Sequence, residues 1–266
     1  MLNSPLITVM TAAVRKAARG VVRDFGEVEK LQISKKGAAN FVTNADLRTD
    51  KLLIEELQRT RSKFGFLTEE SGMIGNPNMT QRFVIDPIDG TTNFIHALPY
   101  IAISVAAQER KAGGAWETVA GVVYDPIHDE LFVAARKEGA YLNNQRLRAS
   151  NRTDDLLVGT SSPRKSREGF SHALDAFNRV ADSGATIRCS GSAALDLAYV
   201  AAGRLDGMWY QRLNIWDMAA GTLIVQEAGG LITSIDGSPV VTDESGSVVA
   251  ASKPVHGPLQ KLLASA

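Results

Sequence analysis

The chain has 266 residues, 44% of them hydrophobic, which is enough for one large α/β domain or for two smaller layers that share a core. Its 29 basic and 29 acidic residues balance, so no net field attracts nucleic acid or an anionic membrane, and neither is an expected partner. The one cysteine, Cys189, excludes an internal disulfide and is expected to be a small buried side chain in a protein of the reducing cytoplasm. No segment approaches the roughly 20 apolar residues that span a bilayer.

The N-terminal segment is predicted to be an amphipathic helix, not a signal peptide, because its charges follow its apolar stretch. This helix should run over about 4–25, with Ser4 as N-cap and Pro5 in the first turn. Its apolar face would consist of Leu6, Val9, Met10, Ala13, Val14, Ala17 and Val21. A second helix is predicted over about 45–60, starting at the cap signal Asn44 to Asp46.

The remainder of the first half has the patterns of strands. Alternating or β-branched runs, separated by glycine, proline and aspartate, predict strands at 82–86, 101–108, 117–125 and 130–135. No long helical pattern lies between these runs. Residues 1–150 are therefore predicted to form an α+β part with a largely antiparallel sheet, carrying most of the candidate metal ligands.

After about residue 150, strand and helix patterns alternate. The predicted strands lie at 156–161, 185–189, 206–210, 231–236 and 248–252. The predicted helices lie at 168–182, 191–203, 216–230 and 256–264. This alternation predicts a smaller α/β sheet in residues 151–266.

The stretch FVIDPIDGTTNF, residues 83–94, ends an apolar strand pattern on two carboxylates, Asp86 and Asp89. Two carboxylates about 4 Å apart repel by roughly 4 kcal/mol at an effective dielectric near 20. No lysine or arginine lies between Arg82 and Arg110, so a divalent cation is the nearest source of compensating charge. Taken alone, the stretch could equally be an ordinary type I turn with an Asp-Gly pair.

Other acids occupy similar places. Glu69 and Glu70 close the run GFLTEES and could form a solvated loop tip, whereas Asp217 and Asp46 could be helix N-caps. Together these acids place several carboxylates at the ends of apolar elements, which is typical of a metal site. The four histidines are scattered and no histidine–cysteine cluster exists, so oxygen ligands favour Mg²⁺ or Mn²⁺ over zinc.

The end of the same stretch is suited to a phosphate. Gly90 lets the backbone approach closely, Thr91 and Thr92 supply hydroxyls, and a helix that starts there would offer free N–H groups. Two metal ions could then hold the attacking and leaving oxygens of an in-line displacement. The D-x-x-D spacing differs from the D-x-D of haloacid-dehalogenase-type phosphatases, so water is favoured over aspartate as the nucleophile. No Walker A loop is present.

Over almost its whole length the chain resembles the inositol monophosphatase family. Its two long motifs are DPIDGTTNF (86–94) and WDMAAGTLIVQEAGG (216–230), and the shorter ones are VTNAD (42–46), TEES (68–71) and GSAALDLAYVAAGRLDG (191–207). The resemblance implies a layered αβαβα sandwich, a homodimer, inhibition by lithium, and Mg²⁺-dependent hydrolysis of a small phosphorylated polyol.

The resemblance also implies a set of metal ligands. Glu69, Asp86 and the backbone carbonyl of Ile88 would bind a first Mg²⁺, and Asp86, Asp89 and Asp217 would bind a second. A third, weaker ion near Glu69 would carry the nucleophilic water. The site would thus hold two to three ions, with Mn²⁺ as a substitute for Mg²⁺.

The implied catalytic residues are Glu69, Thr91 and Asp46, of which the last two would form a pair that helps to activate the water. The backbone amides of Gly90 and Thr91 would hold the phosphate, next to the hydroxyl of Thr92. The alcohol side would be lined by Gly191, Ser192 and Ala193.

The chain departs from the family pattern at Tyr210, seven residues before Asp217, where inositol-type members carry a glutamate that accepts hydrogen bonds from the sugar alcohol. A phenol is bulkier and neutral, so Tyr210 is a candidate substrate residue, and selectivity should shift by a few kcal/mol at most.

Three functions are therefore considered. The first is hydrolysis of inositol 1-phosphate. The second is the same chemistry on 3′-phosphoadenosine 5′-phosphate, fructose 1,6-bisphosphate or histidinol phosphate. The third is a regulatory protein that contacts RNA or the transcription machinery through basic clusters at 15–19 and 162–167.

Overall fold

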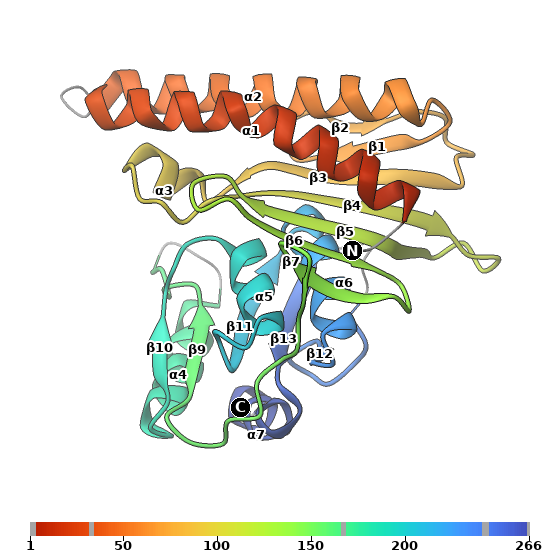
Figure 1. Cartoon of the computed structure of the whole chain (residues 1–266). Coiled ribbons are helices and arrows are strands. Elements are labelled where there is room, and N and C mark those ends of the chain that lie inside the picture. Colours follow the sequence, from red (N-terminus) through yellow and green to blue (C-terminus); the bar gives the residue numbers. More distant parts are fainter. Residues whose placement is uncertain (1–3, 32–34, 166–168, 241–244, 265–266) are drawn as a thin grey trace.

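The computed structural model describes residues 4–31, 35–165, 169–240 and 245–264. They form five layers in the order helices, sheet, helices, sheet, helices (Figure 1). The predicted αβαβα sandwich, with one larger and one smaller sheet, is confirmed.

Three pairs of helices make up the helical layers. Helices α1 (Pro5–Leu31) and α2 (Lys35–Thr60) cover the outer face of the larger sheet, at the top of Figure 1. Helices α5 (Ala193–Ala201) and α6 (Ile215–Glu227) lie between the sheets. Helices α4 (Phe170–Asp182) and α7 (Lys253–Ala264) cover the far face of the smaller sheet, and a short helix α3 (Thr91–Ile95) follows the third strand.

The larger sheet has eight strands in the order β2-β1-β3-β4-β5-β6-β7-β8. Every neighbouring pair is antiparallel except β1 and β3, which are parallel, so the predicted largely antiparallel sheet is confirmed. The strands are β1 (Gly65–Thr68), β2 (Gly72–Ile74), β3 (Gln81–Asp89), β4 (Ala102–Arg110), β5 (Trp116–Asp125), β6 (Glu130–Ala135), β7 (Gly139–Leu142) and β8 (Gln145–Arg146).

The smaller sheet has five strands in the order β10-β9-β11-β13-β12. The first three are parallel to one another, and the last two pairs are antiparallel. The strands are β9 (Leu157–Thr160), β10 (Thr186–Arg188), β11 (Gly207–Leu213), β12 (Leu231–Thr233) and β13 (Gly246–Ala251).

The middle layer joins the two halves of the chain. One cluster of buried residues contains Val84 and Val123 of the larger sheet, Leu197 of α5, and Met208 and Val248 of the smaller sheet. Because apolar side chains of both halves are buried together, residues 1–150 and 151–266 share a core. A site between them is therefore held rigidly from both sides.

Burial explains the outer helical layer as well. The predicted apolar face of α1 packs on the larger sheet, where Met10, Val14 and Val21 are almost fully buried. The second helix begins at Lys35 instead of near Asn44, so the predicted cap signal lies inside it. Asp46 is therefore a buried residue of the helix interior and not an N-cap.

Cys189 is exposed, so its predicted burial is wrong. It directly follows β10, a three-residue strand at the edge of the smaller sheet whose first and last residues are also exposed.

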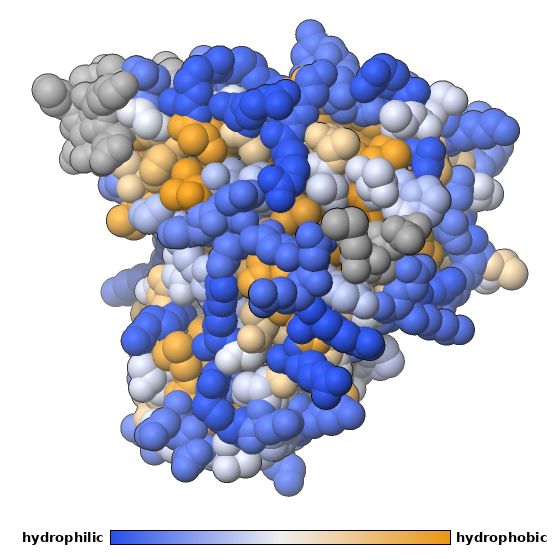
Figure 2. Space-filling model, viewed as in Figure 1, coloured by the Kyte–Doolittle hydropathy of each residue, from blue (hydrophilic) through white to orange (hydrophobic). Residues whose placement is uncertain are grey.

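Figure 2 shows that hydrophilic side chains cover most of the visible face, with apolar side chains in separate groups. Among the described residues, no helix has the length and hydropathy that a membrane span requires.

Close packing of the larger sheet on the middle layer can be tested at Gly121 of β5. A Cβ there would lie 2.8 Å from the carbonyl oxygen of Ala220 in α6. We expect Gly121→Ala to lower the free energy of unfolding by about 1–3 kcal/mol, because backbone must move, as urea unfolding would measure. Gly113→Ala, where no atom lies within 4 Å, should change it by less than about 0.5 kcal/mol. Equal effects of the two substitutions would contradict this packing.

Candidate metal centre

The DPID stretch lies at the end of β3, where the pairing with β4 is irregular. Asp86 is opposite Ser104 and Asp89 is opposite Ala102, so three steps along β3 match two along β4. In a regular strand, residues three apart point to opposite faces. The extra residue, next to Pro87, which has no N–H, forms a bulge that turns both aspartates to the same side.

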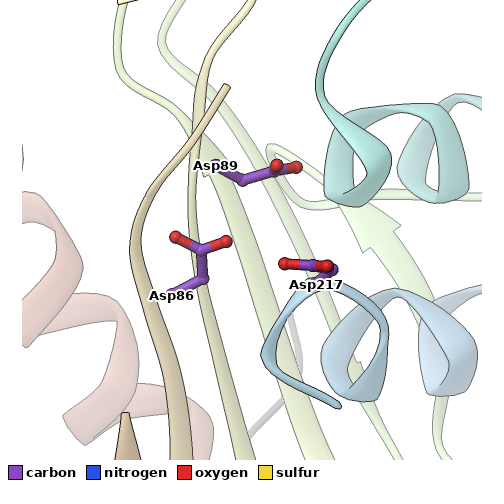
Figure 3. Close-up of side chains that lie close together, drawn as sticks. All are labelled: Asp86, Asp89 and Asp217. Atoms are coloured by element: carbon purple, nitrogen blue, oxygen red, sulfur yellow. The ribbon is translucent and has the colours of Figure 1, made fainter. Parts of the chain in front are cut away.

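Asp217 approaches the same point from the other half of the chain. Ligand oxygens of Asp86, Asp89 and Asp217 all lie within 4.8 Å of one another, and Figure 3 shows the three side chains converging from β3 and from the start of α6. Asp217 stands in the first turn of α6, where its carboxylate accepts a hydrogen bond from the Asn214 N–H at 2.9 Å. It is thus the third residue of the helix, and Asn214 is the N-cap.

Asp89 is held by the start of α5. One of its oxygens, Oδ2, accepts hydrogen bonds from the Ser192 hydroxyl at 2.6 Å and from the Ala194 N–H at 2.7 Å. Ser192 also caps α5 by accepting from the Leu195 N–H at 3.3 Å. The orientation of Asp89 is therefore fixed.

Glu69 follows β1 directly, and its N–H donates to the carbonyl of Ile85 at 3.1 Å. The turn that carries it is tied to α2, because Asp50 accepts from the hydroxyls of Thr68 at 3.2 Å and Ser71 at 2.5 Å. Glu69 is not one of the three converging carboxylates. Its carboxyl nevertheless lies near Asp86, since each of the two groups affects the pKa of the other.

Unbalanced negative charge dominates this site. Burial raises the pKa of Asp86 well above its usual range, and the charges of Asp89 and Glu69 raise it further. Burial and the charge of Asp89 raise the pKa of Asp217 to about 7. Burial raises the pKa of Asp89 to about 6, against the opposing effect of its hydrogen bonds from Ser192 and Ala194. Burial, with Glu70 and Glu69 adding repulsion, raises the pKa of Asp46 to about 8.

The glycine and threonines of the motif form a tight turn between β3 and α3. Gly90 has a φ of +101°, and a Cβ on it would lie 2.9 Å from the carbonyl oxygen of Tyr100, so only glycine fits there. Thr91 and Thr92 open α3 and are exposed. The Thr91 hydroxyl donates to the carbonyl of Ile88 at 3.4 Å, and no hydrogen bond joins it to Asp46, so the expected Thr91–Asp46 pair is not formed here.

Asn93 is a residue of this site that the sequence reasoning missed. Its buried side-chain amide donates to the carbonyls of Tyr100 at 2.7 Å and Ser190 at 2.8 Å. It also packs against Gly191, where a Cβ would lie 2.8 Å from the Asn93 amide. Asn93 therefore fastens the motif to the loop before α5. Its position inside DGTTNF, between two threonines and a buried phenylalanine, could have indicated that Asn93 belongs to the site.

A pocket of about 810 Å³ opens beside the carboxylates. Of the predicted substrate residues, Thr92, Gly191, Ala193 and Tyr210 line it, together with Asp89 and Asp217. Ser192 is fully buried and does not line it, because its hydroxyl is engaged with Asp89.

Tyr210 contributes to the pocket wall but is itself nearly buried. Its hydroxyl donates to Asp196 at 2.9 Å, and Tyr100 donates to the other oxygen of the same carboxylate at 2.7 Å. Asp196 has no exposed surface, and burial raises its pKa to about 7 despite these two donors. The phenol of Tyr210 is thus used to satisfy a buried acid, an arrangement the sequence did not reveal.

The donor set fits a hard divalent cation. It consists of carboxylate oxygens with no histidine or thiol among the three that converge, which is the ligand type preferred by Mg²⁺ and Mn²⁺. The pKa values of these carboxyl groups are raised because the groups are buried without a compensating positive charge, and a bound cation would supply that charge.

Comparison with known proteins gives a consistent result. The family model described as "Inositol monophosphatase family" matches residues 2–266. The chain is 44% identical to an inositol-1-monophosphatase of Caulobacter vibrioides, covering 97% of this chain and 100% of that protein. It is 38% identical to Nus factor SuhB of Escherichia coli, covering 88% and 86% of the two chains. The crystal structure of extragenic suppressor protein suhB from Bartonella henselae has a TM-score of 0.86 at 40% identity, covering 98% and 99%.

The carboxylate cluster predicts how stability depends on pH when no metal is bound. The pKa values of Asp46, Asp89 and Asp217 are raised to about 8, 6 and 7, whereas an unfolded aspartate titrates near 3.9. The folded state thus holds protons that the unfolded state has released, so stability is full below about pH 4 and is lost as the pH rises to about 8. In EDTA, urea unfolding should show a loss of at least about 2 kcal/mol between pH 5.5 and pH 8.

Two controls assign this slope to the cluster. Asp217→Asn should flatten it, and saturating Mg²⁺ should remove most of it in the parent chain. Equal stability at the two pH values in EDTA would contradict the repulsion described here.

Proposed function

The chain belongs to the inositol monophosphatase family and is a metal-dependent phosphatase, and from this premise we propose that it hydrolyses inositol 1-phosphate to inositol and phosphate with Mg²⁺. The observation that carries the proposal is the convergence of Asp86, Asp89 and Asp217 beside an open pocket. The relative from Caulobacter vibrioides, named for this activity, supports the choice of alcohol.

The proposed metal ligands divide into two overlapping sets. Glu69, Asp86 and the carbonyl of Ile88 form the first, and Asp86, Asp89 and Asp217 form the second, with a third ion near Glu69. Bound ions would supply positive charge where the phosphoryl group and the leaving oxygen accumulate negative charge. Mn²⁺ should substitute for Mg²⁺, because both prefer carboxylate oxygens.

The chain's own groups bind and orient the substrate in this proposal. The Gly90 and Thr91 amides hold the phosphate. The tight turn that presents these amides requires glycine at position 90, because the φ of +101° is unfavourable for a residue with a Cβ. Thr92 lines the same pocket and could add its hydroxyl. Thr91 and Asp46 help to activate the attacking water near Glu69, and Asp46 lies close enough to Asp86 for its charge to add to burial in raising the pKa of that residue.

The proposed alcohol side of the site includes the small residues at the start of α5. Gly191 and Ala193 line the pocket, and Ser192 acts through Asp89, whose orientation it fixes. Tyr210 contributes its ring, because its hydroxyl is engaged with Asp196. This difference from the family pattern keeps the alternative substrates under consideration: 3′-phosphoadenosine 5′-phosphate, fructose 1,6-bisphosphate and histidinol phosphate.

A regulatory role is a second candidate function, motivated by the similarity to Nus factor SuhB. The basic cluster at 15–19 offers it limited support, because Arg15 forms an ion pair with Asp129 and Lys16 with Glu56. Part of the other cluster, 162–167, lies outside the described residues. Homodimerisation, which the family resemblance implies, is part of the proposal and can be read from the mass in solution.

Asp89→Asn tests the role of the cluster. Asparagine can still accept from Ser192 and Ala194, so the chain should fold, but the site loses one negative ligand. We expect Mg²⁺-dependent phosphate release to fall by at least about 10³-fold, since each tenfold loss corresponds to about 1.4 kcal/mol of transition-state stabilisation. Asp154→Asn, an exposed acid away from the site, is the matched control and should retain full activity. Near-normal turnover by Asp89→Asn would overturn the assignment.

The substrate is tested by a phosphate-release panel of inositol 1-phosphate, the three alternatives and a generic aryl phosphate, with Mg²⁺, Mn²⁺ and Li⁺ titrations. We expect turnover of inositol 1-phosphate with Mg²⁺ or Mn²⁺ and inhibition by Li⁺. Hydrolysis of the aryl phosphate without any turnover of inositol 1-phosphate would reject this alcohol while keeping the chemistry.

A further inference from the structure

The pocket beside the carboxylates extends beyond the three aspartates onto the smaller sheet and α4. Its volume of about 810 Å³ lies in the upper part of the ~300–1,000 Å³ range of ligand pockets. Asp89, Asp217 and Thr92 line one end, where the phosphate ester would react. The rest of the wall comes from the smaller sheet, the segment that follows β9, α4 and the start of α5.

Strand pairing brings two arginines to this second wall. Strands β9 and β11 are parallel, with Thr160 opposite Trp209, so the chain that leaves β9 runs beside the end of β11. Arg164 lies on the first of these segments and Arg212 on the second, and both line the pocket. Both side chains are exposed, and within the described part of the chain neither forms an ion pair.

Among the residues that the structure describes, no acid lines the wall that carries the two arginines. His172, from the first turn of α4, lines the same wall, and that turn contains no acid. Within the described ranges, the acids that line the pocket are Asp89 and Asp217, at the reacting end. The pocket thus has a negative end that suits metal ions and a positive end that suits an anion.

Tyr210, which contributes to the same wall, offers little to a neutral polyol. Its hydroxyl proton is donated to Asp196, so the residue has no free donor for a substrate hydroxyl. At this position Tyr210 can therefore only accept a hydrogen bond from a polyol, whereas an arginine can donate to two oxygens of an anion in a bidentate manner.

We propose that Arg164 and Arg212 form a second phosphate-binding subsite, so that the enzyme prefers substrates whose alcohol carries a second phosphate group over the matching monophosphates. The inference rests on the proposed phosphatase function and narrows its substrate class. It favours bisphosphates over histidinol phosphate, whose amine is a cation that the arginines repel.

The test compares matched pairs that differ only in the second phosphate. Suitable pairs are inositol 1-phosphate with inositol 1,4-bisphosphate, fructose 1-phosphate with fructose 1,6-bisphosphate, and 3′-AMP with 3′-phosphoadenosine 5′-phosphate. For at least one pair, kcat/KM for the bisphosphate should exceed that for the monophosphate by about tenfold or more. In Arg164→Gln and Arg212→Gln this ratio should fall by about tenfold, whereas Arg19→Gln, an exposed arginine on α1, should leave it unchanged.

Each outcome decides the proposal. Ratios near one for all three pairs, or a ratio that survives both pocket substitutions, would overturn the subsite while leaving phosphatase activity established by the monophosphates. Failure of the proposed function is a different result: no phosphate ester, including an aryl phosphate, would then be hydrolysed with Mg²⁺ or Mn²⁺.

Discussion

Repulsion among buried carboxylates is the constraint on which this structure depends. Asp86, Asp89 and Asp217 bring ligand oxygens within 4.8 Å of one another, with Glu69 and Asp46 nearby. Two such charges repel by roughly 4 kcal/mol at about 4 Å even at an effective dielectric near 20. The fold holds them together because it fixes each one separately, through the bulge in β3, the first turn of α6 and the start of α5. The repulsion lowers the stability of the metal-free protein, and a bound cation would relieve it.

The layered architecture explains why the site lies where it does. β3 belongs to the larger sheet and α6 to the layer between the sheets, and a shared core of both halves fixes their relative position. Asp89 links them further, since it accepts hydrogen bonds from Ser192 and Ala194 at the start of α5. Asn93 then fastens the turn after β3 to the loop before α5. The three aspartates, the turn after β3 and the pocket beside them are thus parts of one rigid junction.

Much of this was predictable from the sequence because it is encoded locally. Strand alternation, the apolar face of α1 and the acids at the ends of apolar runs indicated both sheets and the nature of the site. The beginning of α2 could not be predicted, since the cap signal at Asn44 to Asp46 lies within a longer helix. The exposure of Cys189 could not be predicted either. Contacts between distant segments were also beyond reach: nothing local shows that Tyr210 donates to Asp196, that Ser192 faces Asp89, or that Arg164 and Arg212 share a pocket wall.

The most direct measurement of the central claim is anomalous diffraction from crystals soaked in Mn²⁺. The account predicts a strong peak among Asp86, Asp89 and Asp217, with carboxylate oxygens at about 2.1 Å, and a second peak shared by Asp86 and Glu69. An absence of Mn²⁺ from the three aspartates in crystals whose pocket is open to solvent, with peaks only at surface acids elsewhere, would contradict it.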